Sequence, residues 1–203
     1  MTHSQLLNDA ELDVLKEIGS IGAGHAAGAL SELIGRPVML QVPSVHLLGF
    51  DDALERLGGA DSPTIASVFR VSGEAEGWMF VLFSPETAHA LLTLLLGERS
   101  KESFKSLEFS AVGEVGNIVL GAYLTAIYNL TKLTLSPSVP NVVFDMVGAV
   151  LSAGLAEASA YGDEVLFIDS AFKDIGPGAV QFLFMPHLTT YQTFLDALGA
   201  AAK

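Results

Sequence analysis

The chain has 203 residues, half of them hydrophobic and 16% charged, with a formal net charge of −13. This length suits one compact domain or two small interlocked halves, and the hydrophobic content gives no reason to expect disorder. No Lys/Arg cluster accompanies the acidic balance, so a protein that binds DNA or RNA through its phosphates is disfavoured. Cysteine is absent, which excludes disulfides, thiolate metal sites and cysteine nucleophiles.

Two uncharged stretches, Val115–Thr131 and Leu133–Phe144, raise the question of a membrane, as does the mean hydropathy of +0.47. A spanning helix needs about 20 predominantly apolar residues. The first stretch is interrupted by Asn117 and Asn129, and the second contains two prolines, so we expect a buried helix followed by buried extended chain. The N-terminus lacks the basic region and apolar run of a secretory signal. We therefore expect a cytoplasmic protein without membrane contact.

In the first half, Asn8 and Glu11 form a capping-box pattern at the start of a helix, and Pro37 marks its end. Pro85 suits the first turn of a later helix. The expected elements are, in order, a helix from Asn8 to about Gly35, extended chain at Val38–Phe50, a loop at Asp51–Pro63 that could contain a short helical turn, strands at Thr64–Ser72 and Trp78–Ser84 around a Gly73–Gly77 turn, and a helix from Pro85 to Leu96.

The second half repeats this order. Its expected elements are a helix near Leu107–Thr131, strands near Val139–Ser152, Glu164–Phe172 and Val180–Met185, and a helix from about His187 to Leu198. The repeat is also visible residue by residue, because Glu114, Asn117 and Gly121 follow Glu17, Ser20 and Gly24 by 97 positions each. The register holds as far as Val42-Pro43 against Val139-Pro140, and Pro186 later follows Pro85 by 101 positions.

These patterns predict an α+β fold. Neighbouring strands joined by short turns favour antiparallel pairing. We expect internally duplicated helix–three strands–helix units, at about residues 8–100 and 104–200, related by a pseudo-two-fold axis in an antiparallel sheet. The segment between them, Lys101–Ser106, is short, so residues 1–203 are expected to form a single interlocked domain.

Polar residues at helical spacing mark a candidate site in each repeated helix. Residues three apart lie on one face of a helix, so each glutamate points with the polar residue that follows it. Such pairs are commonly a solvated face, but asparagine is a poor interior helix former, and here it lies in an uncharged stretch. The candidate residues are Asp13, Glu17 and Ser20 in the first helix and Ser110, Glu114 and Asn117 in the second.

Interior glycines occur throughout both helices, each at a cost of about 1 kcal/mol relative to alanine. Their repeated use favours either close helix packing or an open surface on which a partner can lie near the backbone. The glycines are Gly19, Gly22, Gly24 and Gly28 in the first helix and Gly113, Gly116 and Gly121 in the second.

The repeated helix resembles that of the CheC–CheX–FliY family of chemotaxis phosphatases. The residues that carry the resemblance are the run from Leu15-Lys-Glu17-Ile-Gly19 to Gly24 and the Ser110-x-x-x-Glu114-x-x-Asn117 pattern. Two such helices in a chain of this length favour the CheC type over the CheX type, which is built on one active helix. No residues remain for the flagellar-switch domain of FliY-type proteins.

The resemblance implies a hydrolase acting on the phospho-aspartate of a CheY-like receiver, with the Mg²⁺ held by the receiver and no cofactor or metal bound by this chain. Asn117 would orient the attacking water, and Glu114 would engage the receiver's lysine. Ser20 stands where the family pattern has asparagine, so Glu17 and Ser20 are expected to form a degenerate second site. Asp13 and Ser110 are expected to play a local, supporting role.

Other functions receive less support from the sequence. A non-catalytic adaptor that binds the phosphorylated receiver or a CheD-type deamidase stays open, because one copy lacks the asparagine. A flagellar-switch component is weakened by the missing switch domain. The glycines of the first helix have the wrong order for a nucleotide-binding loop, and the histidines at positions 3, 25, 46, 89 and 187 show no paired metal-ligand spacing.

Overall fold

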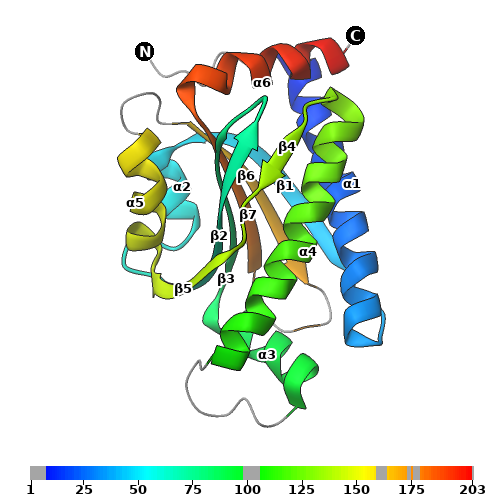
Figure 1. Ribbon diagram of the computed structural model, residues 1–203, viewed down its shortest axis with the longest axis vertical. Coiled ribbons are helices and arrows are strands. Elements are labelled where there is room, and N and C mark those ends of the chain that lie inside the picture. The colour runs from blue at the N-terminus through cyan, green and yellow to red at the C-terminus, as the bar shows by residue number, and fades with distance from the viewer. Residues whose placement is uncertain (1–7, 98–105, 159–163, 173–174, 176–178, 203) are drawn as a thin grey trace.

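The computed structural model describes residues 8–97, 106–158, 164–172, 175 and 179–202. Helices cover both faces of one antiparallel sheet (Figure 1), which confirms the predicted α+β class. The helices are α1 (Asp9–Ile34), α2 (Phe50–Arg56), α3 (Pro85–Leu96), α4 (Ser106–Thr131), α5 (Val147–Ala158) and α6 (Leu188–Ala201). The strands are β1 (Leu40–Gly49), β2 (Pro63–Gly73), β3 (Gly77–Phe83), β4 (Leu135–Pro137), β5 (Asn141–Met146), β6 (Glu164–Phe172) and β7 (Ala179–Pro186).

The helix boundaries of the first half follow the capping signals of the sequence. The Asn8 side chain accepts a hydrogen bond from the Glu11 N–H at 3.0 Å, and the Glu11 carboxylate accepts one from the Asn8 N–H at 2.8 Å. Gly35 ends α1 in the left-handed conformation, with φ of 74°, which a glycine adopts without steric cost. Ser84 caps α3, with Pro85 in its first turn, as predicted.

The sheet separates two hydrophobic clusters. Its strand order is β1-β6-β7-β3-β2-β4, and β5 pairs with β2 beside β4. Along β2, Ile65 and Phe69 point to the face that α1, α3, α4 and α6 cover, whereas Ala66 and Val68 point to the face that α2 and α5 cover. This alternation follows from the two-residue period of a strand. The larger cluster therefore lies beneath the two long helices, α1 and α4.

The two halves exchange strands within this sheet. β1 pairs with β6 of the second half, and β5 pairs with β2 of the first half. The two strand pairs are equivalent. Val45 lies opposite Ile168 and Val142 lies opposite Ser67, where Val142 follows Val45 by 97 positions and Ile168 follows Ser67 by 101. α1 and α4 both contain 26 residues and begin 97 positions apart. Two copies related by an approximate two-fold axis produce this pattern.

The predicted junction between the copies, Lys101–Ser106, lies outside the described residues except for Ser106, the first residue of α4. The division of residues 1–203 into two repeats at this point stays a prediction.

The strand predicted at Val139–Ser152 is wrong beyond Met146, because the chain turns there into α5. Val147, Val150 and Leu151 recur at helical spacing and are buried against the sheet, so tertiary burial favours a helix over a longer strand. The N–H of Val147 donates to the Ser62 carbonyl oxygen at 2.8 Å, which fixes the end of β5. α2 occupies the equivalent place in the first half, where the short helical turn allowed within Asp51–Pro63 is confirmed, so only the second unit contains a helix that was not predicted.

α4 is the buried helix expected at Val115–Thr131, although it is more apolar than that expectation allowed. The helix is long and apolar enough to cross a membrane by length and composition, with a mean hydropathy of 1.3 in its most apolar window. This is weak evidence, because 56% of that window is buried inside the protein and core helices pass the same test. Val115 and Val119 pack into the larger hydrophobic cluster, so α4 is a core helix of this fold.

Candidate functional site

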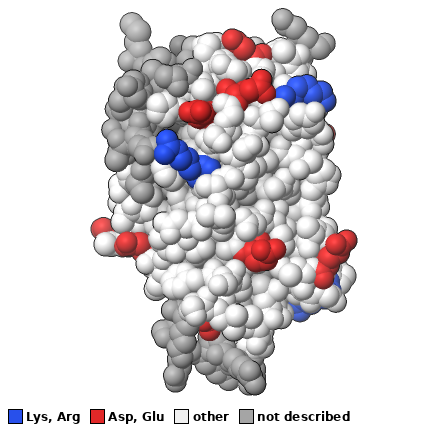
Figure 2. All heavy atoms as spheres, in the orientation of Figure 1, with Lys and Arg blue, Asp and Glu red and all other residues white. Residues whose placement is uncertain are grey.

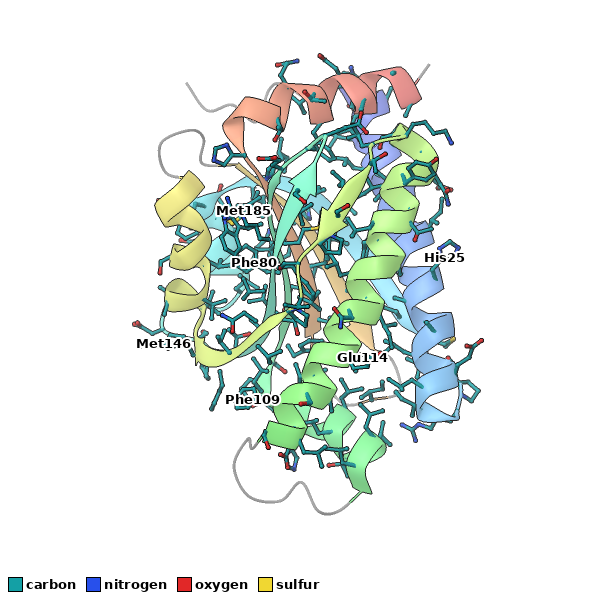
Figure 3. All side chains as sticks on the ribbon, viewed as in Figure 1. His25, Phe80, Phe109, Glu114, Met146 and Met185 are labelled. Carbon is teal, nitrogen blue, oxygen red and sulfur yellow. The ribbon has the colours of Figure 1, made fainter. Side chains whose placement is uncertain are left out.

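The second candidate site forms one exposed stripe along α4. Ser110, Glu114, Asn117 and Gly121 are all exposed, at spacings of four, three and four residues. Most of the remaining surface of the helix is buried against the sheet and α1. Figure 3 shows Glu114 on the side of α4 toward α1, with Phe109 on the other side. The predicted neighbours Glu114 and Asn117 therefore share a solvent-facing surface, as their spacing requires.

Neither side chain of this pair is engaged within the described part of the chain. Glu114 belongs to no ion pair there, and neither Glu114 nor Asn117 makes a side-chain hydrogen bond to another described residue. A carboxylate offers acceptors, and a carboxamide offers both a donor and an acceptor. The pair can therefore present both kinds of hydrogen-bonding group to a molecule that approaches α4.

The first candidate site forms the equivalent stripe on α1, where Asp13, Glu17, Ser20 and Gly24 are exposed. Figure 1 shows α1 and α4 running in opposite directions side by side. The stripe on α1 therefore uses the equivalent face of its helix, and its residues follow one another in the opposite direction. Ser20 presents a short hydroxyl where α4 presents the longer amide of Asn117.

The two leading residues make local contacts. Asp13 forms an ion pair with Lys16 at 2.7 Å, but both side chains are well exposed, so the pair adds little stability. The Ser110 hydroxyl donates to the Ser106 carbonyl oxygen at 2.8 Å within the first turn of α4. Both contacts lie within one helical turn, as expected for a local role. A supporting role in a functional site stays a prediction.

Close packing fixes α4 directly behind the Glu114–Asn117 stripe. Gly116 lies against β2, and a Cβ atom at that position would come within 2.5 Å of the Ser67 Cβ. The buried Ser67 hydroxyl donates to the Val112 carbonyl oxygen at 3.3 Å. On the next face of the helix, a Cβ at Gly113 would be 3.2 Å from a methyl group of Val142 on β5. The sheet therefore holds the turn that carries both polar residues.

Both interpretations of the helix glycines apply, at different positions. Gly22, Gly113 and Gly116 permit close packing, since an added Cβ would press on neighbouring atoms at each. Gly24, Gly28 and Gly121 have nothing within 4 Å of such a Cβ. The open glycines lie on the exposed sides of α1 and α4, so the backbone of both helices is accessible there.

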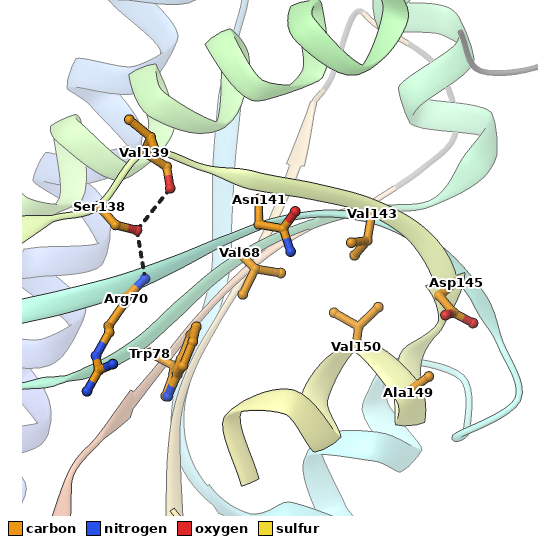
Figure 4. Close-up of a pocket in the computed structure, with 10 residues that line it drawn as sticks. All are labelled: Val68, Arg70, Trp78, Ser138, Val139, Asn141, Val143, Asp145, Ala149 and Val150. Atoms are coloured by element: carbon orange, nitrogen blue, oxygen red, sulfur yellow. Dashed lines mark hydrogen bonds between the residues drawn. The ribbon is translucent and has the colours of Figure 1, made fainter. Parts of the chain in front are cut away.

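A separate hollow of about 350 Å³ lies on the other face of the sheet, beneath α5. Figure 4 shows Asn141 of β5 near its middle and Val150 of α5 opposite. Arg70, Trp78 and Asp145 are its other large polar or aromatic lining residues. None of the predicted site residues lines this hollow, and the sequence contains no motif that pointed to it.

Charged groups also meet on that second face, where Asp169 of β6 and His46 of β1 lie on adjacent strands. Burial raises the pKa of Asp169, an effect that Arg56 opposes. Burial and the nearby Arg56 lower the pKa of His46. Among the described residues, no three His, Cys, Asp or Glu side chains converge to hold a metal ion.

Known proteins share both sequence and fold with this chain. The model of the CheC-like family matches residues 107–144, from α4 to β5. The chain is 35% identical over 202 residues to the CheY-P phosphatase CheC of Bacillus subtilis (strain 168), covering 96% of this chain and 97% of that protein. This near-complete match confirms the family resemblance seen in the repeated helix.

Two solved structures with lower identity share the fold. FliY of Thermotoga maritima aligns with a TM-score of 0.73 and 18% identity over 96% of this chain and 98% of its own. FliM of Helicobacter pylori, in its complex with SpeE, aligns with a TM-score of 0.73 and 13% identity over 96% and 97%. The fold is therefore shared more widely than the sequence, while the match to the Bacillus protein shows that this chain belongs to the CheC-like family.

Proposed function

We propose that this chain is a phosphatase that hydrolyses the phospho-aspartate of a CheY-like receiver, and that α4 carries its working site. The observation that carries the proposal is the Glu114–Asn117 pair, exposed on a core helix and without a hydrogen-bond partner among the described residues. Family membership supports it, since the 35% identical relative bears the name CheY-P phosphatase. The substrate is then a protein, which agrees with a site on a convex helix surface.

The chemistry needed is the transfer of a phosphoryl group from an aspartate to water. The water oxygen forms a bond to phosphorus as the bond from phosphorus to the aspartate oxygen breaks, which yields free carboxylate and inorganic phosphate, with the proton released to phosphate or solvent. Such reactions require positioning and charge stabilisation more than covalent assistance. The amide of Asn117 can accept a hydrogen bond from the water through Oδ1 while its NH₂ group donates to a phosphoryl oxygen.

A neutral amide suits this task better than a carboxylate. A negative side chain at position 117 would repel the phosphoryl oxygens, whereas the amide orients water without that repulsion. The Mg²⁺ that neutralises the phosphoryl charge belongs to the receiver in this proposal. The contribution of this chain is therefore to place one water molecule in line with the breaking bond.

Glu114 has a different role in the proposal. Its carboxylate lies one helical turn before Asn117 on the same exposed face. A charge-assisted hydrogen bond to a lysine of the receiver would orient the partner and place its phospho-aspartate over Asn117. Glu17 could make the same contact from α1, but Ser20 beside it is too short to reach the water. We therefore assign one working site and one degenerate site.

The test follows loss of the acyl phosphate from a Mg²⁺-loaded phosphorylated receiver with and without this protein. The native chain should accelerate hydrolysis, and Asn117→Ala should reduce that acceleration on the order of a hundredfold because the water loses its orientation. Asn117→Asp should not restore it, since a carboxylate repels the phosphate. Acceleration that survives Asn117→Ala would remove the site assignment.

A second candidate function is that of an adaptor which binds the phosphorylated receiver or a CheD-type deamidase without catalysis. The observation that favours it is Ser20, which leaves the exposed α1 stripe with a glutamate and no amide. Native protein that binds the receiver and leaves its acyl-phosphate lifetime unchanged would favour the adaptor. Binding of a deamidase that survives changes on both stripes would place that partner elsewhere on the molecule.

A further inference from the structure

Most of the large apolar side chains that the described residues expose belong to the second copy. Among the described residues, seven large hydrophobic side chains are exposed, and five of them lie on α4 or in the chain that follows it. Those five are Leu107, Tyr128, Val139, Phe144 and Met146. Figure 2 shows the same face of the molecule as Figure 1, with large areas that carry no Lys, Arg, Asp or Glu. These five side chains therefore add exposed apolar surface on α4 and in the chain that follows it.

Two of these side chains, Phe144 and Met146, lie on the sheet face that carries α4. Phe144 pairs with Ile65 and Met146 with Pro63, and alternate residues of β5 share a face with Val142, which contacts α4 at Gly113. Phe144 is 50% exposed and Met146 48%. We call these two residues the β5 patch. β5 approaches α4 at Val142, and Figure 3 shows Met146 on the side of α4 from which Phe109 projects.

The first copy has no such patch. The positions equivalent to Phe144 and Met146, 97 residues earlier, are Leu47, which is half-buried, and Gly49. The same copy also has Ser20 in place of the amide. The β5 patch and the complete Glu–Asn pair therefore occur together in one copy of a duplicated structure, and neither has an equivalent at the matching positions of the other copy.

Electrostatics gives a reason for this coincidence. The chain has a net charge of −13, and the partner in the proposed function carries a negative phosphoryl group. The negative charge of this chain repels the phosphoryl group, so apolar contact would strengthen binding beside the charged contact of Glu114. A phenylalanine and a methionine on the neighbouring strand provide adaptable apolar contact area.

We propose that the β5 patch is the apolar part of the surface that docks the phosphorylated receiver, on the flank of α4 next to the Glu114–Asn117 stripe. The inference rests on the proposed function. In this arrangement α4 supplies the polar contacts to the phospho-aspartate region, and β5 supplies an apolar contact to a neighbouring surface of the receiver. Phe144 and Met146 then set affinity, while Asn117 sets the rate of the chemical step.

The test compares Phe144→Ser and Met146→Ser with Met39→Ser, a matched control whose methionine is 53% exposed in the first half. Binding is measured to a receiver loaded with Mg²⁺ and beryllofluoride, which mimics the acyl phosphate without being hydrolysed. The KM and kcat of hydrolysis are measured in parallel. Each patch variant should raise Kd and KM about fivefold to twentyfold with kcat within twofold of native, and the control should change neither. Phe144→Leu should retain most of the affinity, which separates apolar contact from loss of folding.

Several outcomes would overturn the inference. Patch variants that behave like Met39→Ser would remove the patch from the docking surface, and a fall in kcat at constant KM would give it another role. A change of assembly mass in sedimentation, with receiver affinity unchanged, would assign the patch to contacts between copies of this chain. If the native protein binds the receiver but does not accelerate hydrolysis, the proposed function fails, and the binding comparison still decides the patch.

Discussion

α1 and α4 are equivalent helices of the two copies, but they are buried to different extents. Three positions of α1 that are exposed, Lys16, His25 and Ala29, correspond to Gly113, Ala122 and Ala126 of α4, all of which are buried. At Gly113 the cause is direct, because β5 packs against that side of the helix. The helix that retains both glutamate and asparagine is therefore the one that the rest of the molecule holds more firmly. A site that must position one water molecule gains from such support.

The contact between α1 and α4 is also unequal. Gly22 of α1 lies against the ring of Tyr123, with no room for a Cβ. The equivalent positions across the approximate two-fold axis are Val119 and Ala26. One contact thus joins a glycine to a tyrosine, and its equivalent joins a valine to an alanine. The summed side-chain volume stays similar enough for close packing while the two sequences diverge. The symmetry of the backbone therefore does not require symmetry of the side chains.

The glutamates give the sharpest comparison of the two stripes. Glu114→Gln should lower kcat/KM toward the phosphorylated receiver on the order of 10- to 100-fold, because a charge-assisted hydrogen bond to the partner is lost. Glu17→Gln, the equivalent change on α1, should alter kcat/KM less than twofold. Steady-state measurements of acyl-phosphate loss provide both values. Equal effects of the two changes would contradict a single working site.

The support behind Asn117 can be broken without touching the stripe itself. Gly116→Ala should destabilise the fold by about 1–3 kcal/mol and lower kcat roughly tenfold, because the new Cβ collides with Ser67 and displaces the turn. Denaturant unfolding and single-turnover hydrolysis measure the two effects. Gly24→Ala is the matched stability control, and it should stabilise α1 by up to about 1 kcal/mol because open space surrounds it.

A compensating change tests the proposed cause. Ser67→Gly removes the side chain that the new Cβ would meet, so the double variant should regain most of the kcat lost in Gly116→Ala. The free energy of unfolding should recover less completely than kcat, because the double variant also loses the hydrogen bond from the Ser67 hydroxyl to the Val112 carbonyl oxygen. A double variant no faster than Gly116→Ala would show that steric displacement by Ser67 is not the reason for the loss.

The sequence predicted those parts of the fold that local chemistry decides. Asn8, Gly35 and Pro85 act within one helical turn, and the helices they bound were predicted correctly. The shared face of Glu114 and Asn117 follows from helical spacing alone. The strand Glu164–Phe172 was also predicted at its observed bounds, since alternation and nearby turn residues are local signals.

Features that depend on tertiary contacts were missed. Val147–Ala158 is a helix because three of its apolar residues are buried against the sheet, and their short run at helical spacing does not by itself distinguish a helix from a buried strand. The sequence also did not show the contact of Gly116 with Ser67, because the two residues meet only when β2 lies beneath α4.

Tyr123 links the two helices to the sheet, and its titration offers a smaller test of the unequal contact. Its hydroxyl hydrogen-bonds with Ser170 at 3.2 Å, and its ring stacks on Phe182 with centroids 4.4 Å apart. Burial raises the pKa of Tyr123 to about 12, while the bond to Ser170 acts in the opposite direction. The unfolded chain loses this proton near pH 10 and the folded chain near pH 12, so stability should fall as pH rises between these values, by roughly 2–3 kcal/mol.

Tyr123→Phe removes both the hydrogen bond and the titration. The variant should be about 1 kcal/mol less stable than the native protein at pH 8, because the buried Ser170 hydroxyl loses its partner. Above pH 10 the difference should shrink and then reverse, since phenylalanine has no proton to lose. Chemical unfolding from pH 8 to pH 12 measures this change. A difference that stays constant over that range would show that Tyr123 titrates alike in the folded and unfolded chain.

The smallest expected effect comes from restoring the missing amide. Ser20→Asn gives α1 the same Glu–Asn pair as α4, on an exposed position where the longer side chain meets no obstacle from burial. If the amide were the sole deficiency, the activity would double, and it would persist when Asn117→Ala is added. We expect a gain below twofold, because α1 lacks the β5 patch at Leu47 and Gly49 and is less firmly held along its exposed side. Hydrolysis by Ser20→Asn in the Asn117→Ala background isolates the restored site, and activity there equal to that of the native protein would show that the amide alone separates the two copies.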